Sequence, residues 1–275
     1  MKAAFDFLDK TNTPNEPSLI VQVGYQGVSY VIIDNQQHCH ALAVYDVAIS
    51  SDTTTLCDLL KRIIADNPVL QLVFKKITLV YDFPQTLLVP PAYKNHTSNR
   101  QMLELLFGDM SDNVLYTDFM YKHNLYNIFA ISRKLDEVLS YLFISDEKMH
   151  LQSILPYVQS FSANHLYCIF GNNHLNAMLL VDGKLQVMQS FNFFSPDDAV
   201  YFLLQTCNAY QVDPSNVELQ LHGRIDQSSV LCREISQYFD EIVFSSLPES
   251  FSYSEDVKQL PSHYFSHLFE IAACV

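Results

Sequence analysis

The sequence predicts an α/β fold with mixed sheets, in which a β-β-β-α-β unit occurs twice and forms two lobes. Two apolar segments of similar length, residues 18–47 and 165–194, lead to this prediction. Each reads as three short strands with a glycine at the first turn, followed by a helix and a further strand. A length of 275 residues is natural for two domains. The alternative is two unrelated α/β segments whose lengths agree by coincidence.

The domain boundaries follow from this repeat. Residues 1–17 are polar and contain two prolines, which is typical of a flexible N-terminal arm. We expect the first lobe over residues 18–147 and the second over residues 148–260. Residues 261–275 are expected to form a C-terminal helix that packs back on the lobes.

The first lobe opens with a three-strand meander. The letters GYQG separate its first two strands, and both Gly24 and Gly27 are available for the positive φ that tight hairpin turns require. Residues 40–47 give the third strand.

A helix and a buried strand follow the meander. Residues 50–68 have the apolar periodicity of a helix, which Ser51 or Asp52 can cap and Pro68 ends. The β-branched and aromatic segment 75–83 predicts a buried strand.

The rest of the first lobe contains two more helices. Residues 97–109 carry a capping box at Ser98 and Gln101, and Gly108 is expected to end that helix in a left-handed conformation. Residues 133–143 have apolar side chains on one side and predict a second helix.

Two aromatic-rich strands, 114–121 and 125–131, are predicted between these helices. Their alternation is expected to bring Tyr116, Phe119 and Tyr121 near one another across a hairpin. Such aromatic rows pack in cores, and exposed ones also serve in recognition surfaces.

The second lobe repeats the pattern. A strand near 150–155 leads into the second meander at 165–193, and a helix follows that Ser195 caps and Asp198 supports. The remaining predicted elements are a strand at 216–223, a helix at 228–239, a strand at 241–246 and the closing helix at 261–274.

Composition narrows the function classes. Sixteen basic and thirty acidic residues give a net charge of −14, which disfavours nucleic acid and anionic lipid as partners. No apolar stretch is long enough to span a membrane. Scattered cysteines without a CxxC pair predict a reducing, cytoplasmic location without disulfides. The cysteines are Cys39, Cys57, Cys168, Cys207, Cys232 and Cys274.

The repeated unit resembles the actin-like ATPase superfamily, a ribonuclease H-like fold that includes sugar kinases, Hsp70 chaperones and pilus-assembly cytoplasmic ATPase-like proteins. The stretches LIVQVGYQGVSYVIID, ITLVYDFPQTLLVP and HYFSHLFEIAAC look more closely like a bacterial family of unknown function with this fold. The likeness covers residues 18–275.

The resemblance implies where nucleotide would bind. The family's first hairpin reads D-x-G-T, with an aspartate that holds the Mg²⁺ water shell, and here Gln22 stands at that aspartate and Gly24 at the glycine. The second hairpin reads D-x-G-G-G-T, where this chain has Ile169 for the aspartate. The implied vestigial nucleotide residues are Gln22, Gly24, Gly27, Gly171, Asn172 and Gly223.

These replacements predict a chain without ATPase activity. Magnesium prefers carboxylate and water oxygens, and phosphoryl transfer needs that metal to hold charge. We therefore expect no catalysis and no ATP or Mg²⁺ cofactor, and we interpret the chain as a non-catalytic module that binds a protein partner or forms a homo-oligomer. The alternative is a nucleotide or small-ligand binder, or a weak kinase or ATPase that uses an atypical residue such as Asp82.

Two histidine pairs invite a metal hypothesis. His38 and His40 lie on one face of a strand, and His263 and His267 are four apart on the last helix. Two ligands do not complete a zinc site, and Tyr264 stands where an HExxH motif has its glutamate. We expect an exposed strand face for the first pair and a surface pair for the second.

Overall fold

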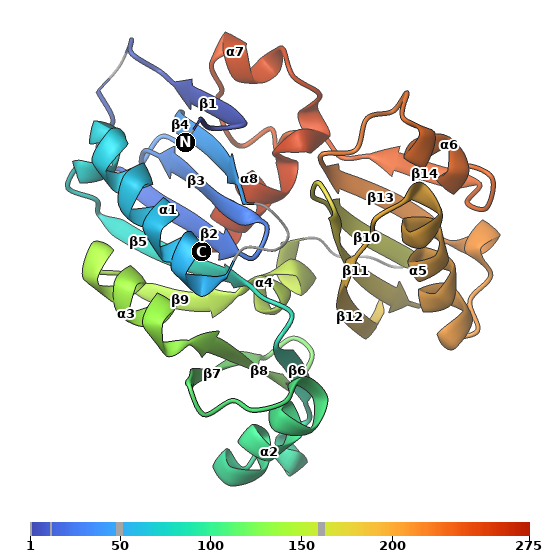
Figure 1. Cartoon of the computed structure of the whole chain (residues 1–275). Helices are drawn as coiled ribbons and strands as arrows, with labels where there is room; N and C mark the ends of the chain where they lie inside the picture. Colours follow the sequence, from blue (N-terminus) through green and yellow to red (C-terminus); the bar gives the residue numbers. More distant parts are fainter. Residues whose placement is uncertain (1, 12, 48–51, 159–162) are drawn as a thin grey trace. The chain divides into compact units, whose positions relative to one another are not determined.

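The computed structural model describes residues 2–11, 13–47, 52–158 and 163–275. The chain divides into two compact units (Figure 1). Unit 1 contains Met1–Ile154 together with Ser252–Ser254, and unit 2 contains Leu155–Phe251 together with Glu255–Val275. Each unit has its own sheet and hydrophobic core.

Unit 1 is built on a six-stranded mixed sheet with the order β1-β4-β3-β2-β5-β9. Strands β2, β3 and β4 form the predicted antiparallel meander, and β5 and β9 continue the sheet parallel to β2. The strands are β1 (Phe5–Leu8), β2 (Ser18–Gly24), β3 (Gly27–Ile33), β4 (Cys39–Asp46), β5 (Lys76–Asp82) and β9 (Glu147–His150).

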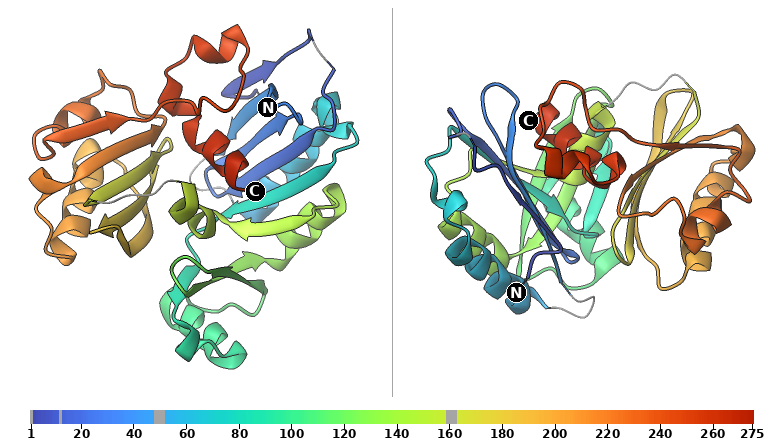
Figure 2. Two further views of the ribbon diagram at one scale, coloured as in Figure 1. Left: turned by 180° about the vertical axis from the view of Figure 1, so that it is seen from behind. Right: turned by 90° about the horizontal axis from the view of Figure 1, so that it is seen from above.

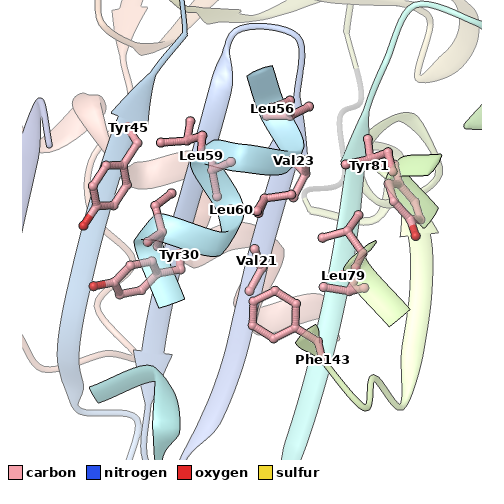
Figure 3. Packing of buried hydrophobic residues seen from close by; sticks show 14 of the residues in the cluster. Val21, Val23, Tyr30, Tyr45, Leu56, Leu59, Leu60, Leu79, Tyr81 and Phe143 are labelled. Atoms are coloured by element: carbon pink, nitrogen blue, oxygen red, sulfur yellow. The ribbon is translucent and has the colours of Figure 1, made fainter. Parts of the chain in front are cut away.

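Helices α1 (Thr53–Asp66) and α3 (Arg133–Leu142) pack together on one face of this sheet (Figure 2). Side chains from α1 fill the space above β2 and β3, where Leu60 and Val23 belong to one fully buried cluster (Figure 3). Asp52 accepts a hydrogen bond from the backbone N–H of Thr55 at 2.9 Å, so it is the predicted helix cap. The alternative cap, Ser51, lies outside the described residues. A 3₁₀ turn, η1 (Pro68–Gln71), follows the helix.

A small three-stranded sheet is inserted between β5 and α3. Its order is β6-β8-β7, and it is formed by β6 (Thr86–Val89), β7 (Asn113–Met120) and β8 (Leu125–Ser132). Strand β8 serves two cores, because Phe129 and Ile131 pack with the main sheet while Ile128 and Ala130 pack with the cluster around Leu103. Alternating residues of a strand point to opposite faces, which allows this division.

The helix of this insert, α2 (His96–Phe107), follows a 3₁₀ turn, η2 (Pro91–Tyr93). The predicted capping box is wrong, because the helix begins two residues before Ser98 and the Ser98 hydroxyl donates to the Asn95 carbonyl. The predicted end is confirmed: Gly108 has a φ of +85°, and its N–H donates to the Glu104 carbonyl.

Unit 2 contains a five-stranded sheet with the order β12-β11-β10-β13-β14. This order matches β4-β3-β2-β5-β9 of unit 1 strand for strand, with the same parallel and antiparallel pairings. The strands are β10 (His165–Phe170), β11 (His174–Val181), β12 (Lys184–Asn192), β13 (Glu218–Gly223) and β14 (Glu241–Phe244).

The first helix of unit 2 is α5 (Pro196–Ala209), and its start is as predicted. Ser195 and Asp198 form a complete reciprocal capping box, in which each side chain accepts from the other residue's backbone N–H. The other helical elements after β9 are α4 (Leu151–Val158), η3 (Pro214–Asn216), α6 (Val230–Ile235), α7 (Glu255–Lys258), η4 (Ser262–Tyr264) and α8 (Ser266–Cys274).

Three expectations about the chain's organisation need correction. The predicted N-terminal arm contains β1, which pairs with β4 and so belongs to the sheet. The strand expected near 150–155 ends at His150, and α4 begins at the next residue. Strand β9 pairs with β5, so the first unit extends beyond the expected boundary at residue 147.

The expected C-terminal helix is α8, preceded by η4, and both contact β13 of unit 2. Among the described residues, no helix combines the length and apolar character that crossing a membrane would require. All six cysteines lie in the described ranges, and each is a free thiol.

Candidate functional site

The position that the family resemblance assigns to magnesium lies near the end of β2. Gln22 is located there, and the neighbouring parallel strand β5 ends with Asp82 opposite Gly24. The Gln22 side-chain Nε2 donates a hydrogen bond to Asp82 Oδ2 at 3.1 Å. The amide that replaces the family's carboxylate is therefore bonded to a carboxylate on the next strand.

The other end of the Gln22 amide is less well satisfied. Its Oε1 atom is buried, and no hydrogen-bond donor reaches it within the described ranges. A carbonyl oxygen and one carboxylate are acceptable oxygen donors for a hard cation, but they carry less charge than two carboxylates. This pair could hold a cation only weakly.

The two glycines of the first hairpin are required by backbone packing. A Cβ on Gly24 would lie 2.4 Å from the Asp82 carbonyl oxygen, and a Cβ on Gly27 would lie 1.9 Å from the Tyr45 carbonyl oxygen. Only Gly27 of the two has a positive φ, at +144°, so the expectation that both could supply it holds for one. Sheet packing alone explains both glycines without a phosphate.

In unit 2 the corresponding hairpin has no carboxylate. Ile169 pairs with Asn176 just as Gln22 pairs with Ser29, and its side chain is buried. Gly171 closes the turn by donating its N–H to the His174 carbonyl at 2.7 Å, and Asn172 is exposed at the turn. A buried aliphatic side chain cannot coordinate a cation.

Gly223 ends β13 beside this hairpin. It has a φ of +78°, and a Cβ there would lie 2.2 Å from the Phe170 carbonyl oxygen. The structure thus places Gln22, Gly24 and Gly27 together in unit 1 and gathers Gly171, Asn172 and Gly223 at one end of the unit 2 sheet.

The two faces of the aromatic hairpin are both packed against hydrophobic clusters, and the second face is covered only in part. Tyr116 was expected near Phe119 and Tyr121, but it packs in the core against Tyr81 and Phe129 at ring-centroid distances of 6.0 and 5.6 Å. Its hydroxyl donates to Asp136 at 2.7 Å. Residues 116 and 119 are three apart on one strand, so they point to opposite faces.

Phe119 and Tyr121 lie on the second face, at the end that the cluster around Leu103 leaves exposed. Their rings are 5.9 Å apart, Phe119 is 4.7 Å from Tyr126, and the exposed fractions of Phe119 and Tyr121 are 43% and 76%. Lys94 places its ammonium 3.8 Å from the centre of the Tyr126 ring, which is a cation–π contact. We call Phe119, Tyr121, Tyr126 and Lys94 the aromatic surface.

Both histidine predictions are wrong. His40 is 2% exposed and His263 is 3% exposed, so neither pair forms a simple surface feature. His263 uses Nε2 to contact the Ile225 carbonyl at 2.7 Å, and loss of hydration lowers the pKa of His267 to about 3. The second pair is thus part of the unit 2 interior.

A buried carboxylate in unit 2 was missed by the sequence analysis. Glu270 on α8 accepts a hydrogen bond from the Tyr167 hydroxyl at 2.6 Å and lines a cavity of about 320 Å³ with Gln220 and Ser245. Burial beside this carboxylate raises the pKa of Tyr167 well above its usual value. In the sequence, the feature that could have indicated this buried carboxylate is the single acidic residue, Glu270, inside the apolar run LFEIAAC.

The fold belongs to a known class. The chain is similar to a Bacteroides thetaiotaomicron protein with an actin-like ATPase fold and unknown function, with a TM-score of 0.75, 13% identity, and coverage of 95% of this chain and 97% of that one. It is also similar to a structure of the PilM–PilN type IV pilus biogenesis complex, with a TM-score of 0.66, 10% identity, and coverage of 93% and 97%. These likenesses establish an actin-like ATPase fold.

The ethanolamine utilization protein EutJ from Carboxydothermus hydrogenoformans is a more distant match, with a TM-score of 0.54, 8% identity, and coverage of 96% and 91%. Residues 8–242 match the family described as protein of unknown function (DUF3822), and the chain belongs to this family. No curated protein sequence matches the chain. The predicted fold and the predicted kind of family are both confirmed.

Proposed function

We propose that this protein is a cytoplasmic, non-catalytic member of the actin-like ATPase fold that acts by binding another protein. The observation that carries the proposal is the hydrogen bond from the Gln22 amide to Asp82, because it occupies the place where the fold's ATPases need a free carboxylate. Ile169 at the equivalent place in unit 2 supports the same conclusion. The matching strand orders support an origin by internal duplication.

The proposed contact region is the aromatic surface. Tyrosine and phenylalanine are enriched in protein interfaces because they bury much apolar area with few rotatable bonds. The inserted three-stranded sheet that carries them has no counterpart in residues 224–240 between β13 and β14, all of which the structure describes. One solved protein of this fold is part of a pilus biogenesis complex, which is consistent with a binding role for this fold.

An ATPase assay with purified protein and Mg²⁺ tests the loss of catalysis. We expect no hydrolysis above the buffer blank and no change in melting temperature with ATP, ADP or sugars. A ligand at one hundred times its Kd would stabilise the folded state by about 2.7 kcal/mol, which a thermal-shift assay detects easily.

The alternative, a nucleotide binder or weak ATPase that uses Asp82, predicts the opposite result. Hydrolysis that disappears in Asp82→Asn and persists in Asp58→Asn would establish it. Asp58 is the matched control because it is exposed on α1 and forms an ion pair with Lys61 on the same helix.

Affinity capture from the native host tests the partner. We expect proteins retained by the wild type to be lost from the double variant Phe119→Ala, Tyr121→Ser and kept by Tyr141→Ser. Tyr141 is a suitable control because it is 88% exposed on α3. If the wild type, the double variant and Tyr141→Ser all retain the same partner proteins equally, the aromatic surface is not the contact region. The ATPase result is unaffected by that outcome.

A further inference from the structure

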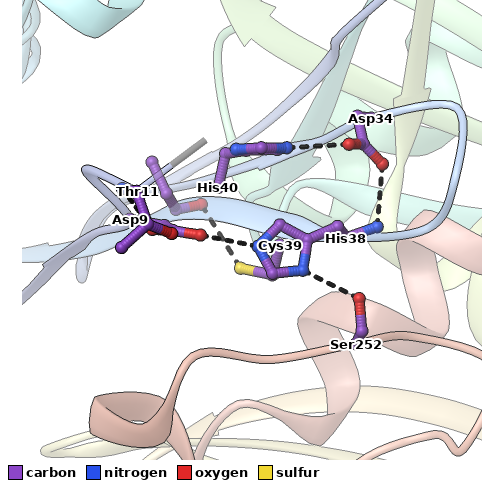
Figure 4. A network of polar contacts seen from close by, with 8 residues as sticks. Asp9, Thr11, Asp34, His38, Cys39, His40 and Ser252 are labelled. Atoms are coloured by element: carbon purple, nitrogen blue, oxygen red, sulfur yellow. Dashed lines mark hydrogen bonds and ion pairs between the residues drawn. The ribbon is translucent and has the colours of Figure 1, made fainter. Parts of the chain in front are cut away.

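Two histidines and two carboxylates gather in unit 1 where β1 meets β4 (Figure 4). His40 on β4 places its Nε2 atom 2.8 Å from Asp34 Oδ2. His38 precedes β4 and places its Nε2 atom 2.8 Å from Asp9 Oδ2. One ligating atom from each of Asp9, His38 and His40 lies within 4.8 Å of the other two.

One ring nitrogen in this cluster, His40 Nδ1, has no hydrogen-bond partner among the described residues. Because a carboxylate only accepts hydrogen bonds, Asp34 requires the proton of His40 to be on Nε2. In the neutral imidazole the other ring nitrogen, Nδ1, then presents a lone pair. This atom is buried, and nothing in the described part of the chain donates to it. A buried lone pair without a partner is unfavourable unless a donor or a cation uses it.

The surrounding residues fix one ring nitrogen of each histidine and orient the Asp9 carboxylate. The Nδ1 atom of His38 is 2.8 Å from the Ser252 hydroxyl, so both histidines have one ring nitrogen fixed by an oxygen. Thr11 donates its backbone N–H and its hydroxyl to Asp9 Oδ1 at 2.7 and 2.6 Å, which leaves Oδ2 directed at His38. Histidines that bind metal almost always have their second nitrogen held in this way.

We propose that Asp9, His38 and His40 form a binding site for a divalent cation of the zinc class. Two imidazoles and one carboxylate suit Zn²⁺, whereas Mg²⁺ and Ca²⁺ prefer oxygen ligands. Neighbouring donors around tetrahedral zinc are about 3.3 Å apart. The 2.8 Å distance between His38 Nε2 and Asp9 Oδ2 must therefore lengthen by about 0.5 Å. Ligand atoms as far apart as 4.8 Å must approach each other by about 1.5 Å, and side-chain rotations can supply both changes.

The cation would join the edge strand β1 to the rest of the sheet. Asp9 directly follows β1, and its backbone N–H already donates to the His40 carbonyl at 2.8 Å. A metal shared by these two residues would fix the same junction through their side chains. We therefore expect metal binding to raise the melting temperature of the protein.

Titration of the untagged, chelator-treated full chain with Co²⁺ and then Zn²⁺ tests the proposal. We expect about one equivalent of Co²⁺ to produce the intense visible bands of tetrahedral coordination, which Zn²⁺ then removes. Asp9→Asn and His38→Gln should each weaken binding at least tenfold. His174→Gln should bind as the wild type does, because His174 begins β11 of unit 2.

Two results would overturn the proposal. One is a wild-type chain that binds no stoichiometric Co²⁺ or Zn²⁺. The other is binding that persists unchanged in both Asp9→Asn and His38→Gln. Circular dichroism of each variant separates lost ligands from lost folding, and His38→Gln is the decisive variant because its side chain is partly exposed.

Discussion

The contact between Gln22 and Asp82 gives a prediction whose size follows from its geometry. Gln22→Glu keeps the shape of the side chain but replaces the donating nitrogen with a charged oxygen 3.1 Å from Asp82 Oδ2. Two unit charges at that distance repel by about 1.3 kcal/mol in water and by about 5 kcal/mol at an effective dielectric constant of 20. Both side chains are half-buried, and rotation relieves part of the repulsion. We expect Gln22→Glu to lower the free energy of unfolding by about 1–3 kcal/mol at pH 7.5.

The loss should depend on pH in a defined direction. As the pH falls, the introduced carboxyl group takes up a proton, because the neighbouring negative charge disfavours its ionised form, and the pair then forms a hydrogen bond in place of the repulsion. The deficit relative to the wild type should therefore be large at pH 7.5 and small at pH 4. Urea unfolding can be followed by circular dichroism or tyrosine fluorescence, since the chain has sixteen tyrosines and no tryptophan.

Gln71→Glu is the matched control, because Gln71 is exposed in η1 of the same unit. It should change the free energy of unfolding, measured from the urea transition, by no more than a surface charge does, about 0.5 kcal/mol or less. A Gln22→Glu variant that is as stable as the wild type at pH 7.5 would refute the reasoning. So would a deficit of equal size at both pH values.

Two further predictions concern stability. Gly27→Ala should lower the free energy of unfolding by roughly 4 kcal/mol or more, because its Cβ would lie 1.9 Å from a backbone oxygen. Gly108→Ala should lower it by only about 1 kcal/mol, because a Cβ there would meet nothing within 4 Å. Equal melting temperatures of the two variants would contradict this prediction. Full burial lowers the pKa of His150 to about 4 from 6.5, so the stability that the neutral ring contributes above pH 6.5 is lost as the pH falls towards 4. The wild type should lose about 2 kcal/mol more than His150→Gln between pH 7 and pH 5, measured by urea unfolding; an equal loss would show that His150 is not the group concerned.

The strands and helices of both meanders could be predicted because their signals are local. Ser195, Pro196 and Asp198 mark the start of α5 in the sequence, and the structure has the complete cap there. Gly108 likewise marks the end of α2. Strand β1 was missed because its alternation covers only four residues and its stability comes from pairing with β4.

The site was less predictable, because it depends on contacts between distant residues. The sequence indicated that Gln22 replaces a carboxylate, but the bond to Asp82 joins residues sixty positions apart. The pairing of Asp9 with His38 spans twenty-nine positions and depends on β1. The position of Tyr116 was missed for a different reason: the hairpin was predicted correctly, but the strand period was not applied to residues 116 and 119.

Strand β8 has a mechanical consequence. Since its odd-numbered residues 129 and 131 are embedded in one core and its even-numbered neighbours 128 and 130 in another, the strand cannot tilt without disturbing both. The small sheet is therefore firmly attached to the main sheet of unit 1. A force applied at the aromatic surface would therefore reach the packing around Tyr81 through this shared strand, because Phe129 of β8 contacts the Tyr81 ring.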